Sequence, residues 1–248
     1  MTDMGNLSFG VDVGGSGVKG CVVDLDAGGL NGERLHIPTP DPSVPEAVAE
    51  VIDEIVQSFD WHGPLGVTLP CVVKAGVANT AANIDHDWIG TDAAELLTAR
   101  IGEPVLVIND ADAAAIAEMR YGAGRDVTGV TVLLTFGTGI GSAVFVNGTL
   151  VPNTELGHLQ LDGRDAEDLA AASVRDELGL SWPQWASRVT TYLRALETVI
   201  WPDLIIVGGG VSKHADKWLP LLDNRTPVVP ASLRNNAGIV GAALAVAG

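Results

Sequence analysis

The sequence predicts an α/β protein made of two domains. Apolar runs of strand length alternate with amphipathic helical patterns, which is typical of sheets covered by helices. One layout, an apolar run, a glycine-rich turn and a second apolar run, occurs near the N-terminus and returns about half a chain later, which indicates an internal duplication. The 248 residues allow one large or two modest domains. We expect domains at 1–110 and 111–248, with a C-terminal helix that can return to the first domain.

The first half opens with a predicted hairpin, in which a glycine-rich turn joins the apolar runs Phe9–Val13 and Cys21–Leu25. Ser43 and Glu46 have the spacing of a capping box, and apolar residues follow at i, i+3 and i+4, so a helix is expected there. The remaining predicted elements of this half are a strand at Leu65–Leu69, a helix at Asp92–Arg100, a strand at Val105–Ile108 and a helix at Ala111–Tyr121.

The second half repeats the hairpin layout with Thr131–Phe136 and Ala143–Val146. A helix is predicted at Glu167–Leu178, ended by Gly179, and Ser181 begins another whose aromatic stripe we assign to the core. The last predicted elements are strands at Leu204–Val207 and Pro227–Val229 and a small-residue helix at Asn236–Ala247.

Charge and composition exclude several classes of protein. The net charge of −17 argues against a broad surface for nucleic acid or anionic membrane, so an anionic ligand must be held locally. No apolar run is long enough to span a membrane, and the N-terminal stretch lacks the pattern of a signal peptide, so a cytoplasmic protein is expected. Cys21 and Cys71 have no C-x-x-C partner and are interpreted as buried thiols.

The first glycine-rich turn, Gly15-Ser-Gly-Val-Lys-Gly20, matches the dinucleotide-binding pattern G-x-G-x-x-G only formally. The residues after it are β-branched and apolar, so a strand follows where that fold requires a helix, and Asp24 comes far too early for the ribose-binding acid. The P-loop pattern G-K-[ST] does not occur in the sequence. Both nucleotide folds are therefore rejected.

A hairpin tip made of glycines can still bind phosphate, because consecutive backbone N–H groups without obstructing side chains form a concave anion site. Two such tips could hold one phosphate chain from two sides. In the first, Asp12 can face Mg²⁺ through water, Ser16 can donate a hydrogen bond and Lys19 can place a cation beside the phosphates. The alternative is that both are ordinary hairpin turns.

Asn109 and Asp110 follow directly on four apolar residues, at the carboxyl end of a predicted strand, where α/β proteins build their sites. Asp110 could accept the proton of a substrate hydroxyl in a phosphoryl transfer. The alternative is that one of the two residues caps the following helix.

A second group of polar side chains suits a neutral sugar, whose hydroxyls both donate and accept hydrogen bonds. Glu155 and His158 are three residues apart near a turn, Glu167 follows, and Asn83 offers an amide. The alternative is a structural histidine beside solvated glutamates.

These motifs together resemble the ROK family of sugar kinases over nearly the whole chain. The resemblance rests on five runs in the family's order: Asp12-Val-Gly-Gly-Ser-Gly-Val-Lys-Gly20, Asn109-Asp-Ala-Asp-Ala-Ala114, Phe136-Gly-Thr-Gly-Ile-Gly141, Glu155-Leu-Gly-His158 and Gly208-Gly-Gly-Val-Ser212. The polyphosphate-using branch is favoured by three more: Leu161-Asp-Gly-Arg-Asp-Ala-Glu167, Leu180-Ser-Trp-Pro-Gln-Trp185 and Arg234-Asn-Asn-Ala-Gly-Ile-Val-Gly-Ala-Ala243.

The resemblance implies an actin-like ATPase (ribonuclease H-like) duplicated fold, with two α/β domains around a central cleft that holds glucose, or mannose. It implies Asp110 as general base, and glucose ligands at Asn83, Asn109, Asp110, Glu155, His158 and Glu167. The implied donor-binding residues are Asp12, Gly14, Gly15, Ser16, Gly17, Lys19, Thr138, Gly139, Gly209 and Gly210, with Asp12 facing Mg²⁺ through water. Gly208 to Gly210 and Asn236 to Gly238 match the places where related kinases hold adenosine.

The implied activity is transfer of a phosphoryl group from inorganic polyphosphate, with ATP as a second candidate donor, to the 6-hydroxyl of glucose. Many family members carry a cysteine-rich zinc motif between the positions of His158 and Glu167; this stretch has no cysteine, so no zinc is expected. The candidates for a basic strip that guides polyphosphate are Lys19, Lys213, Lys217, Arg225 and Arg234. Family likeness suggests a homodimer.

Two other functions remain as alternatives. The first is an ATP-dependent hexose or N-acetylhexosamine kinase on the same fold, which donor tests would distinguish. The second, more remote, is a non-catalytic sugar sensor, since ROK proteins include transcription factors. Those carry a DNA-binding module before the first phosphate motif, and here only eleven residues precede Asp12. The acidic charge also disfavours that reading.

Overall fold

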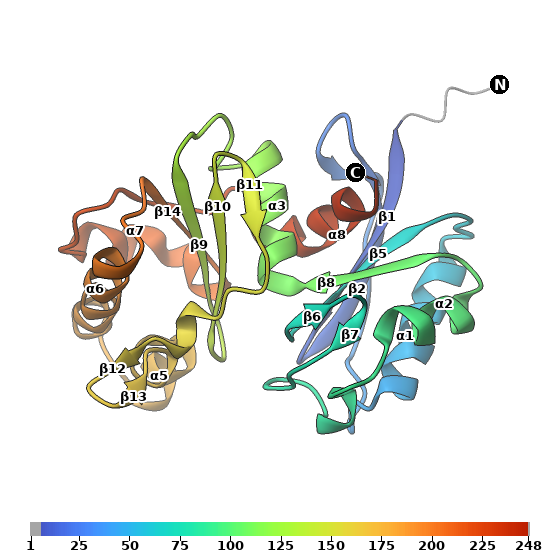
Figure 1. Cartoon of the computed structure of the whole chain (residues 1–248), viewed down its shortest axis with the longest axis horizontal. Helices are drawn as coiled ribbons and strands as arrows, with labels where there is room; N and C mark the ends of the chain where they lie inside the picture. Colours follow the sequence, from blue (N-terminus) through green and yellow to red (C-terminus); the bar gives the residue numbers. More distant parts are fainter. Residues whose placement is uncertain (1–5, 248) are drawn as a thin grey trace. The chain divides into compact units, whose positions relative to one another are not determined.

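The computed structural model describes residues 6–247 (Figure 1). Contacts divide the chain into two compact units, residues 1–117 with 236–248 and residues 118–235. The division falls within helix α3 (Asp110–Tyr121), and it assigns the C-terminal helix α8 (Ala237–Ala247) to the first unit. The domain boundary expected after residue 110 stays a prediction, and the outer ends of the two expected domains, 1–5 and 248, lie outside the described residues.

The first unit is built on a mixed sheet with the order β3-β2-β1-β5-β8, in which β4 also pairs with β2. β1 and β2 are antiparallel, whereas β1, β5 and β8 are parallel. Every residue of β5 is buried, as in parallel strands that are covered on both faces. The strands are β1 (Leu7–Gly14), β2 (Gly17–Asp24), β3 (Gly29–Leu30), β4 (Leu35–Ile37), β5 (Leu65–Leu69) and β8 (Val105–Asn109).

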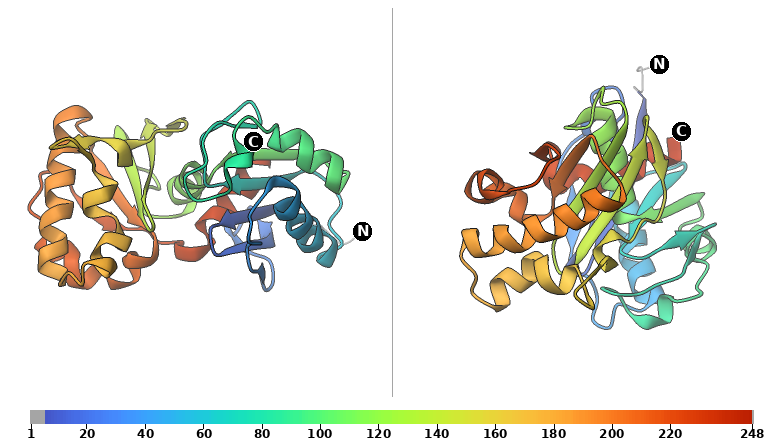
Figure 2. Two further views of the ribbon diagram at one scale, coloured as in Figure 1. Left: turned by 90° about the horizontal axis from the view of Figure 1, so that it is seen from below. Right: turned by 60° about the vertical axis from the view of Figure 1, so that its left-hand side comes forward.

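Helices cover both faces of this sheet (Figure 2). On one face, α1 (Pro45–Ser58) packs so closely that a Cβ on Gly20 would lie 2.5 Å from a methyl group of Ile55. α2 (Ala93–Ile101) packs beside α1. On the other face α8 lies against Gly10 and Gly66, where a Cβ would come within 2.0 Å and 1.9 Å of its carbonyl oxygens. Glycine at these two strand positions lets the helix backbone touch the sheet.

The second unit repeats this topology. Its sheet has the order β11-β10-β9-β14-β15, with an antiparallel β9–β10 hairpin and parallel β9, β14 and β15. An antiparallel pair followed by two parallel strands is the order found in the first sheet, so the predicted duplication is confirmed. The strands are β9 (Val130–Phe136), β10 (Ile140–Val146), β11 (Thr149–Val151), β14 (Leu204–Gly208) and β15 (Val228–Pro230).

The core of the second unit is aromatic. Trp185 and Tyr192 on α6 (Trp182–Val199) are fully buried, as is Trp218 on α7 (Ala215–Trp218). The rings of Trp185 and Trp218 meet edge to face at 4.8 Å between centroids, and Phe136 at the end of β9 packs on both. The prediction that the aromatic stripe is core is confirmed, and so is the burial of both free cysteines.

Two local predictions are wrong. Ser43 does not cap α1, because the helix begins at Pro45 after Val44, and the Ser43 hydroxyl accepts a hydrogen bond from the backbone of Asp85 instead. The helix expected over Glu167–Leu178 is broken at Ala171, whose ψ of 159° is extended, which leaves α4 (Glu167–Ala170) and α5 (Ala172–Glu177).

The sequence patterns also missed several short elements: β6 (Val73–Lys74), β7 (Val77–Ala78), β12 (Gln160–Leu161), β13 (Arg164–Asp165) and the short 3-10 helices η1 (His86–Trp88), η2 (Leu156–His158), η3 (Gly210–His214), η4 (Leu219–Leu221) and η5 (Arg234–Asn236). Strands of two residues are too short to show alternation. Between residues 6 and 247, none of the helices combines the length and the apolar character needed to cross a bilayer.

Candidate active site

The β1–β2 hairpin closes on a two-residue turn. Gly14 pairs with Gly17, which leaves Gly15 and Ser16 exposed at the tip. A Cβ on Gly17 would lie 2.0 Å from Nε2 of the exposed His36 on β4, so a side chain there would require the His36 ring to move. Ser16 is the one residue of the Gly14–Gly17 turn that carries a side chain, which suits the close approach of an anion to the N–H groups of the turn.

Asp12 lies near the end of β1, shortly before this tip, and its carboxylate is held in place by its neighbours. Thr68 on β5 donates a hydrogen bond to its Oδ1 at 3.0 Å, and Nζ of Lys19 lies 3.7 Å from its Oδ2. A Cβ on Gly238 would come 2.6 Å from Oδ1, so glycine in the first turn of α8 makes room for this carboxylate. A carboxylate near a helix N-terminus is favoured by the helix dipole.

Asp110 begins α3 directly after β8, and its Oδ1 accepts a hydrogen bond from the backbone of Ala111 at 2.8 Å. The parallel register pairs Asp12 with Thr68 and Thr68 with Ile108. The carboxyl ends of β1, β5 and β8 therefore share one edge of the first sheet, and Asp12 and Asp110 lie at that edge.

Two predicted sugar ligands of the first unit differ in environment. Asn83 is exposed, and its backbone oxygen lies 3.4 Å from the Cβ position of Gly15, beside the hairpin tip. Asn109 is buried: its Nδ2 donates to the carbonyl of Cys71 at 3.0 Å, and its Oδ1 accepts from the backbone of Asp112 at 3.0 Å. Asn109 thus caps α3, which was the structural alternative, and one amide hydrogen remains for a ligand.

The tip of the β9–β10 hairpin, Thr138 and Gly139, is fixed by its neighbours. Oε2 of Glu167 accepts a hydrogen bond from the backbone of Ile140 at 3.0 Å, and a Cβ on Gly139 would lie 2.4 Å from the same oxygen. The Ser173 hydroxyl donates to the carbonyl of Thr138 at 2.6 Å. Glu167, predicted as a sugar ligand, therefore positions the tip of the β9–β10 hairpin.

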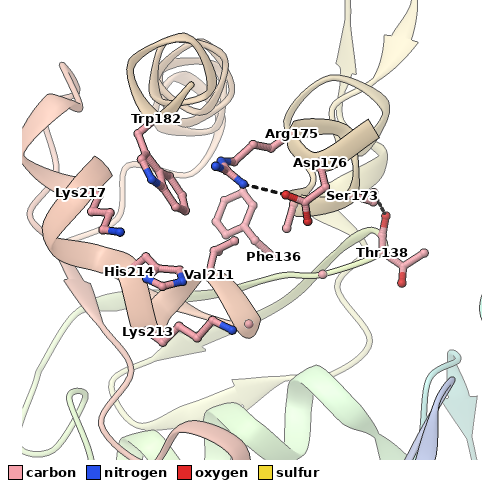
Figure 3. Close-up of a pocket in the computed structure, with 13 residues that line it drawn as sticks. Phe136, Thr138, Ser173, Arg175, Asp176, Trp182, Val211, Lys213, His214 and Lys217 are labelled. Carbon is pink, nitrogen blue, oxygen red and sulfur yellow. Dashed lines mark hydrogen bonds and ion pairs between the residues drawn. The ribbon is translucent and has the colours of Figure 1, made fainter. Parts of the chain in front are cut away.

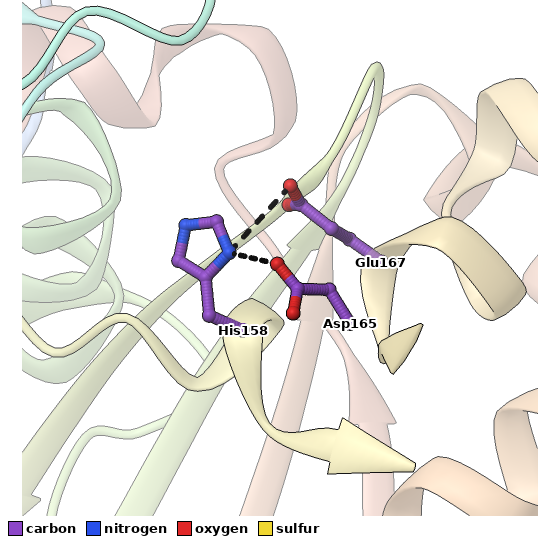
Figure 4. Close-up of side chains that lie close together, drawn as sticks. All are labelled: His158, Asp165 and Glu167. Carbon is purple, nitrogen blue, oxygen red and sulfur yellow. Dashed lines mark hydrogen bonds and ion pairs between the residues drawn. The ribbon is translucent and has the colours of Figure 1, made fainter. Parts of the chain in front are cut away.

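His158 stands among three carboxylates, two of which, Asp165 and Glu167, are drawn with it in Figure 4. Its Nδ1 lies 2.7 Å from Oδ2 of Asp165 and 3.9 Å from Oε1 of Glu167, and its Nε2 lies 3.9 Å from Oε2 of Glu155. The structure brings together Glu155, His158 and Glu167, as the sequence suggested, and adds Asp165. The cluster offers charged donors and acceptors at the surface, where a polyhydroxylated ligand could bind.

The charges in this cluster shift the titration of its members. The hydrogen bond to Asp165 raises the pKa of His158, and the neighbouring carboxylates add to this although partial burial opposes it. Burial raises the pKa of Glu155, helped by Glu167 and opposed by His158. Burial and Glu167 also raise the pKa of Tyr192, whose hydroxyl donates to the carbonyl of Leu156.

His158, Asp165 and Glu167 also form a group whose ligand atoms lie within 4.8 Å of one another. The His158–Asp165 hydrogen bond already uses the ring nitrogen that faces this group. The expectation that the protein holds no zinc stays a prediction.

Gly209 and Gly210 follow the carboxyl end of β14. Gly209 has a φ of 81°, and a Cβ there would lie 2.2 Å from the carbonyl oxygen of Phe136, so only glycine fits beside the end of β9. Gly210 opens η3 and lines a pocket of about 630 Å³ together with Thr138 (Figure 3). The second hairpin and the glycine turn of β14 thus border one cavity.

The five basic residues suggested as a polyphosphate strip lie in different surroundings. Lys213 and Lys217 line the pocket beside Thr138. Lys19 pairs with Asp12 in the first unit, and Arg225 stacks on Trp201 at 3.8 Å, outside the residues that line the pocket. Arg234 lies in η5 with a φ of 51°.

Three residues of these sites were missed. Thr68 is a buried polar residue in an otherwise apolar strand, which is a usable signal. Asp165 stands in a run that resembles the family, but its hairpin, β12–β13, has two-residue strands without periodicity. Arg175 lines the pocket from α5, and nothing in its local sequence indicates that position.

The comparisons with known proteins decide the family. The model of the ROK family matches residues 8–177. The chain belongs to the ROK family. Polyphosphate glucokinase of Mycobacterium tuberculosis (strain CDC 1551 / Oshkosh) is 60% identical over 238 residues, which is 96% of this chain and 90% of that protein. Polyphosphate glucokinase of Mycobacterium leprae (strain TN) is 56% identical over 96% of this chain and 74% of that protein.

Solved ROK structures agree with the fold. The inorganic polyphosphate/ATP-glucomannokinase from Arthrobacter sp. strain KM superposes with a TM-score of 0.94 at 51% identity, covering 97% of this chain and 98% of that one. The ROK family glucokinase from Streptomyces griseus, solved with glucose and AMPPNP, has a TM-score of 0.83 at 24% identity, with 97% and 99% covered, and supports the fold alone. The ROK chain described here has the two-domain α/β fold of the actin-like ATPases.

Proposed function

We propose that this ROK protein is a polyphosphate-dependent glucokinase, which transfers the terminal phosphoryl group of inorganic polyphosphate to the 6-hydroxyl of glucose. The observation that carries the proposal is the identity of 56–60% to proteins named polyphosphate glucokinase over 96% of this chain. ATP is a second donor in the proposal, because the Arthrobacter relative is named for both donors, and mannose is a second acceptor for the same reason.

Asp110 is the general base of the proposed reaction. Its carboxylate takes the proton of the 6-hydroxyl as the sugar oxygen forms a bond to the terminal phosphorus, and the bond from that phosphorus to the bridging oxygen breaks. Polyphosphate leaves shortened by one unit. The placement of Asp110 at the carboxyl end of β8, half-buried and held by the backbone of Ala111, supports this role.

The sugar ligands are those that the sequence predicted. Glu155, His158 and Glu167 hold hydroxyls through charge-assisted hydrogen bonds, and Asn83 and the remaining amide hydrogen of Asn109 hold others. Asp165 fixes the ring of His158 through their 2.7 Å hydrogen bond and so acts through it rather than on the sugar.

The donor lies on the two glycine hairpins. Gly14, Gly15, Ser16 and Gly17, with Lys19, form the first phosphate site, and Thr138 with Gly139 forms the second, next to Gly209 and Gly210. Asp12 fits a water-bridged Mg²⁺, because its fixed carboxylate can accept hydrogen bonds from the waters that this ion usually keeps, and one or two carboxylates with substrate phosphates are the usual set that holds it. When bound, Mg²⁺ would neutralise phosphate charge. We also propose a homodimer, on family likeness, and a cytoplasmic location, as expected from the sequence.

The test supplies glucose and Mg²⁺ with either long-chain polyphosphate or ATP as sole donor and measures glucose 6-phosphate. We expect Asp110→Asn to lower kcat by about 10²-fold or more with either donor. Asp60→Asn is the matched control, since the Asp60 side chain is 97% exposed and its backbone lies in the left-handed region that Asn tolerates. Turnover with ATP alone would make the protein an ATP-dependent ROK kinase, and silence with both donors would overturn the proposal.

A further inference from the structure

The pocket beside the second hairpin gathers several cationic side chains of an acidic protein. Arg175, Lys213 and Lys217 line it, so it holds three of the fourteen Lys and Arg residues of a chain with a net charge of −17. Asp176 is its acidic member, and His214 also lines it. Thr138, where the proposed donor is held, is another of its lining residues.

The guanidinium of Arg175 is held by two side chains, the ring of Trp182 and the carboxylate of Asp176 (Figure 3). Its guanidinium carbon lies 3.8 Å from the centroid of Trp182, and its Nη1 donates to Oδ1 of Asp176 at 2.7 Å. Its Nε finds no acceptor among residues 6–247. A flat cation stacked on indole is oriented at low entropic cost, and it keeps further N–H donors for an anion.

The same stack makes the pocket unfavourable for a purine. An adenine base usually needs the open face of an aromatic ring or an apolar slot, and here the guanidinium covers one face of Trp182 while His214 lies 5.5 Å away, tilted against the indole. The cationic side chains that line the pocket attract anions rather than a neutral ring system. A phosphate chain carries charge along its whole length, whereas ATP carries charge only on its three phosphates.

We propose that the Arg175–Trp182 stack, with Lys213 and Lys217, binds the phosphates of polyphosphate beyond the transferred one, and that Arg175 determines preference for polyphosphate over ATP. The inference rests on the proposed function and deepens it. Arg175 touches the donor chain but not the reacting atoms, so it governs donor affinity rather than the chemical step.

The experiment compares Arg175→Gln with Arg120→Gln. Arg120 is a matched control because its guanidinium also lies over an aromatic ring, that of Tyr121, at 5.9 Å, and its loss changes the net charge equally, yet it does not line the pocket. We expect Arg175→Gln to lower kcat/KM for long-chain polyphosphate at least tenfold, mostly through KM. The KM for glucose should stay within about twofold, and kcat/KM for ATP within about threefold, as for Arg120→Gln.

Two further variants distinguish a loss of polyphosphate binding from damage to the fold. Arg175→Lys keeps the charge but loses the planar stack, so its KM for polyphosphate should lie between those of the wild type and Arg175→Gln. Asp176→Asn removes the carboxylate that competes for the guanidinium, and it should lower the KM for polyphosphate by about two- to fivefold, opposite to any effect of damage to the fold.

The outcomes separate the two claims. If the wild type makes no glucose 6-phosphate from polyphosphate, the proposed function fails and this inference falls with it. If the wild type uses polyphosphate and Arg175→Gln does too, with unchanged KM, only the inference is overturned. An equal loss with ATP, a raised KM for glucose, or the same loss in Arg120→Gln would overturn it as well.

Discussion

His158 is the residue whose charge state most depends on its neighbours. Three carboxylates face its ring, and the nearest, Asp165, forms the hydrogen bond that raises its pKa. A protonated imidazole donates from both nitrogens, so one can hold Asp165 while the other faces Glu155 and is available to the sugar of the proposed function. The cluster therefore stays charge-compensated at a pH where an isolated histidine would have lost its proton.

The variant Asp165→Asn tests this coupling. Without the carboxylate, we expect the pKa of His158 to fall, and an NMR titration of its ring protons measures the fall directly. A raised histidine pKa stabilises the fold fully below the unfolded pKa, and this stabilisation is lost as the pH rises through the folded pKa. The variant should therefore be less stable than the wild type in acid and nearly equal to it at alkaline pH, in urea unfolding at each pH.

The control for this prediction is Asp162→Asn. Asp162 is exposed in the same β12–β13 hairpin and has a φ of 51°, which Asn accepts. It should leave the titration of His158 in place. An unshifted titration in Asp165→Asn would mean that the remaining carboxylates alone set the pKa.

At the scale of single elements, the docking of α8 depends on two strand glycines. The helix backbone occupies the space that side chains at Gly10 and Gly66 would need. We predict that Gly66→Ala lowers the free energy of unfolding by roughly 3 kcal/mol or more, because a Cβ 1.9 Å from the carbonyl of Ala242 must push the helix off the sheet. Thermal unfolding measures the loss, and hydrogen exchange of the α8 amides shows where it occurs.

Gly29→Ala is the matched substitution, since it also lies in a strand of the first sheet and its Cβ would meet nothing within 4 Å. It should change stability by no more than about 0.5 kcal/mol. Equal effects of the two substitutions would show that backbone entropy, and not the contact with α8, decides the cost.

The elements that the sequence predicted well are those with local signals. Both hairpins were recognisable because glycine turns and β-branched flanks lie next to each other in the chain, and α8 was recognisable as a helix. The sequence indicated that this helix can return to the first domain, but it did not indicate where the helix lies on the sheet. That position depends on Gly10 and Gly66, which are far away in the sequence. The break at Ala171 was missed for the opposite reason: Glu167 to Leu178 reads as a continuous helix, and only the tertiary contacts of Glu167 and Ser173 with the β9–β10 hairpin divide it.

For the whole molecule, sequence patterns identified the main candidate residues of the sites better than the neighbouring residues that contact them. Asp12, Asp110 and His158 could be named from strand ends and motifs, whereas Thr68, Asp165 and Arg175 reach their places through sheet register, a minimal hairpin and a short helix. Chain-wide charge gave one further constraint. An acidic protein that handles a polyanion has to collect its few cations at one place, and the pocket beside Thr138 is such a place.

That charge balance leads to the last prediction, which concerns the divalent cation. If Mg²⁺ only screened the repulsion between an acidic protein and polyphosphate, about 0.5 M KCl, with a Debye length well below 10 Å, would replace it. We expect instead that EDTA abolishes glucose 6-phosphate formation, that KCl does not restore it, and that Mg²⁺ does. Asp12→Asn should raise the half-saturating Mg²⁺ concentration about tenfold or more, because the negative charge that holds the water bridge to the ion is lost, whereas Asp60→Asn should leave it unchanged. Recovery in KCl alone would assign the cation to screening, and Asp12 would then serve the fold through Thr68 and Lys19.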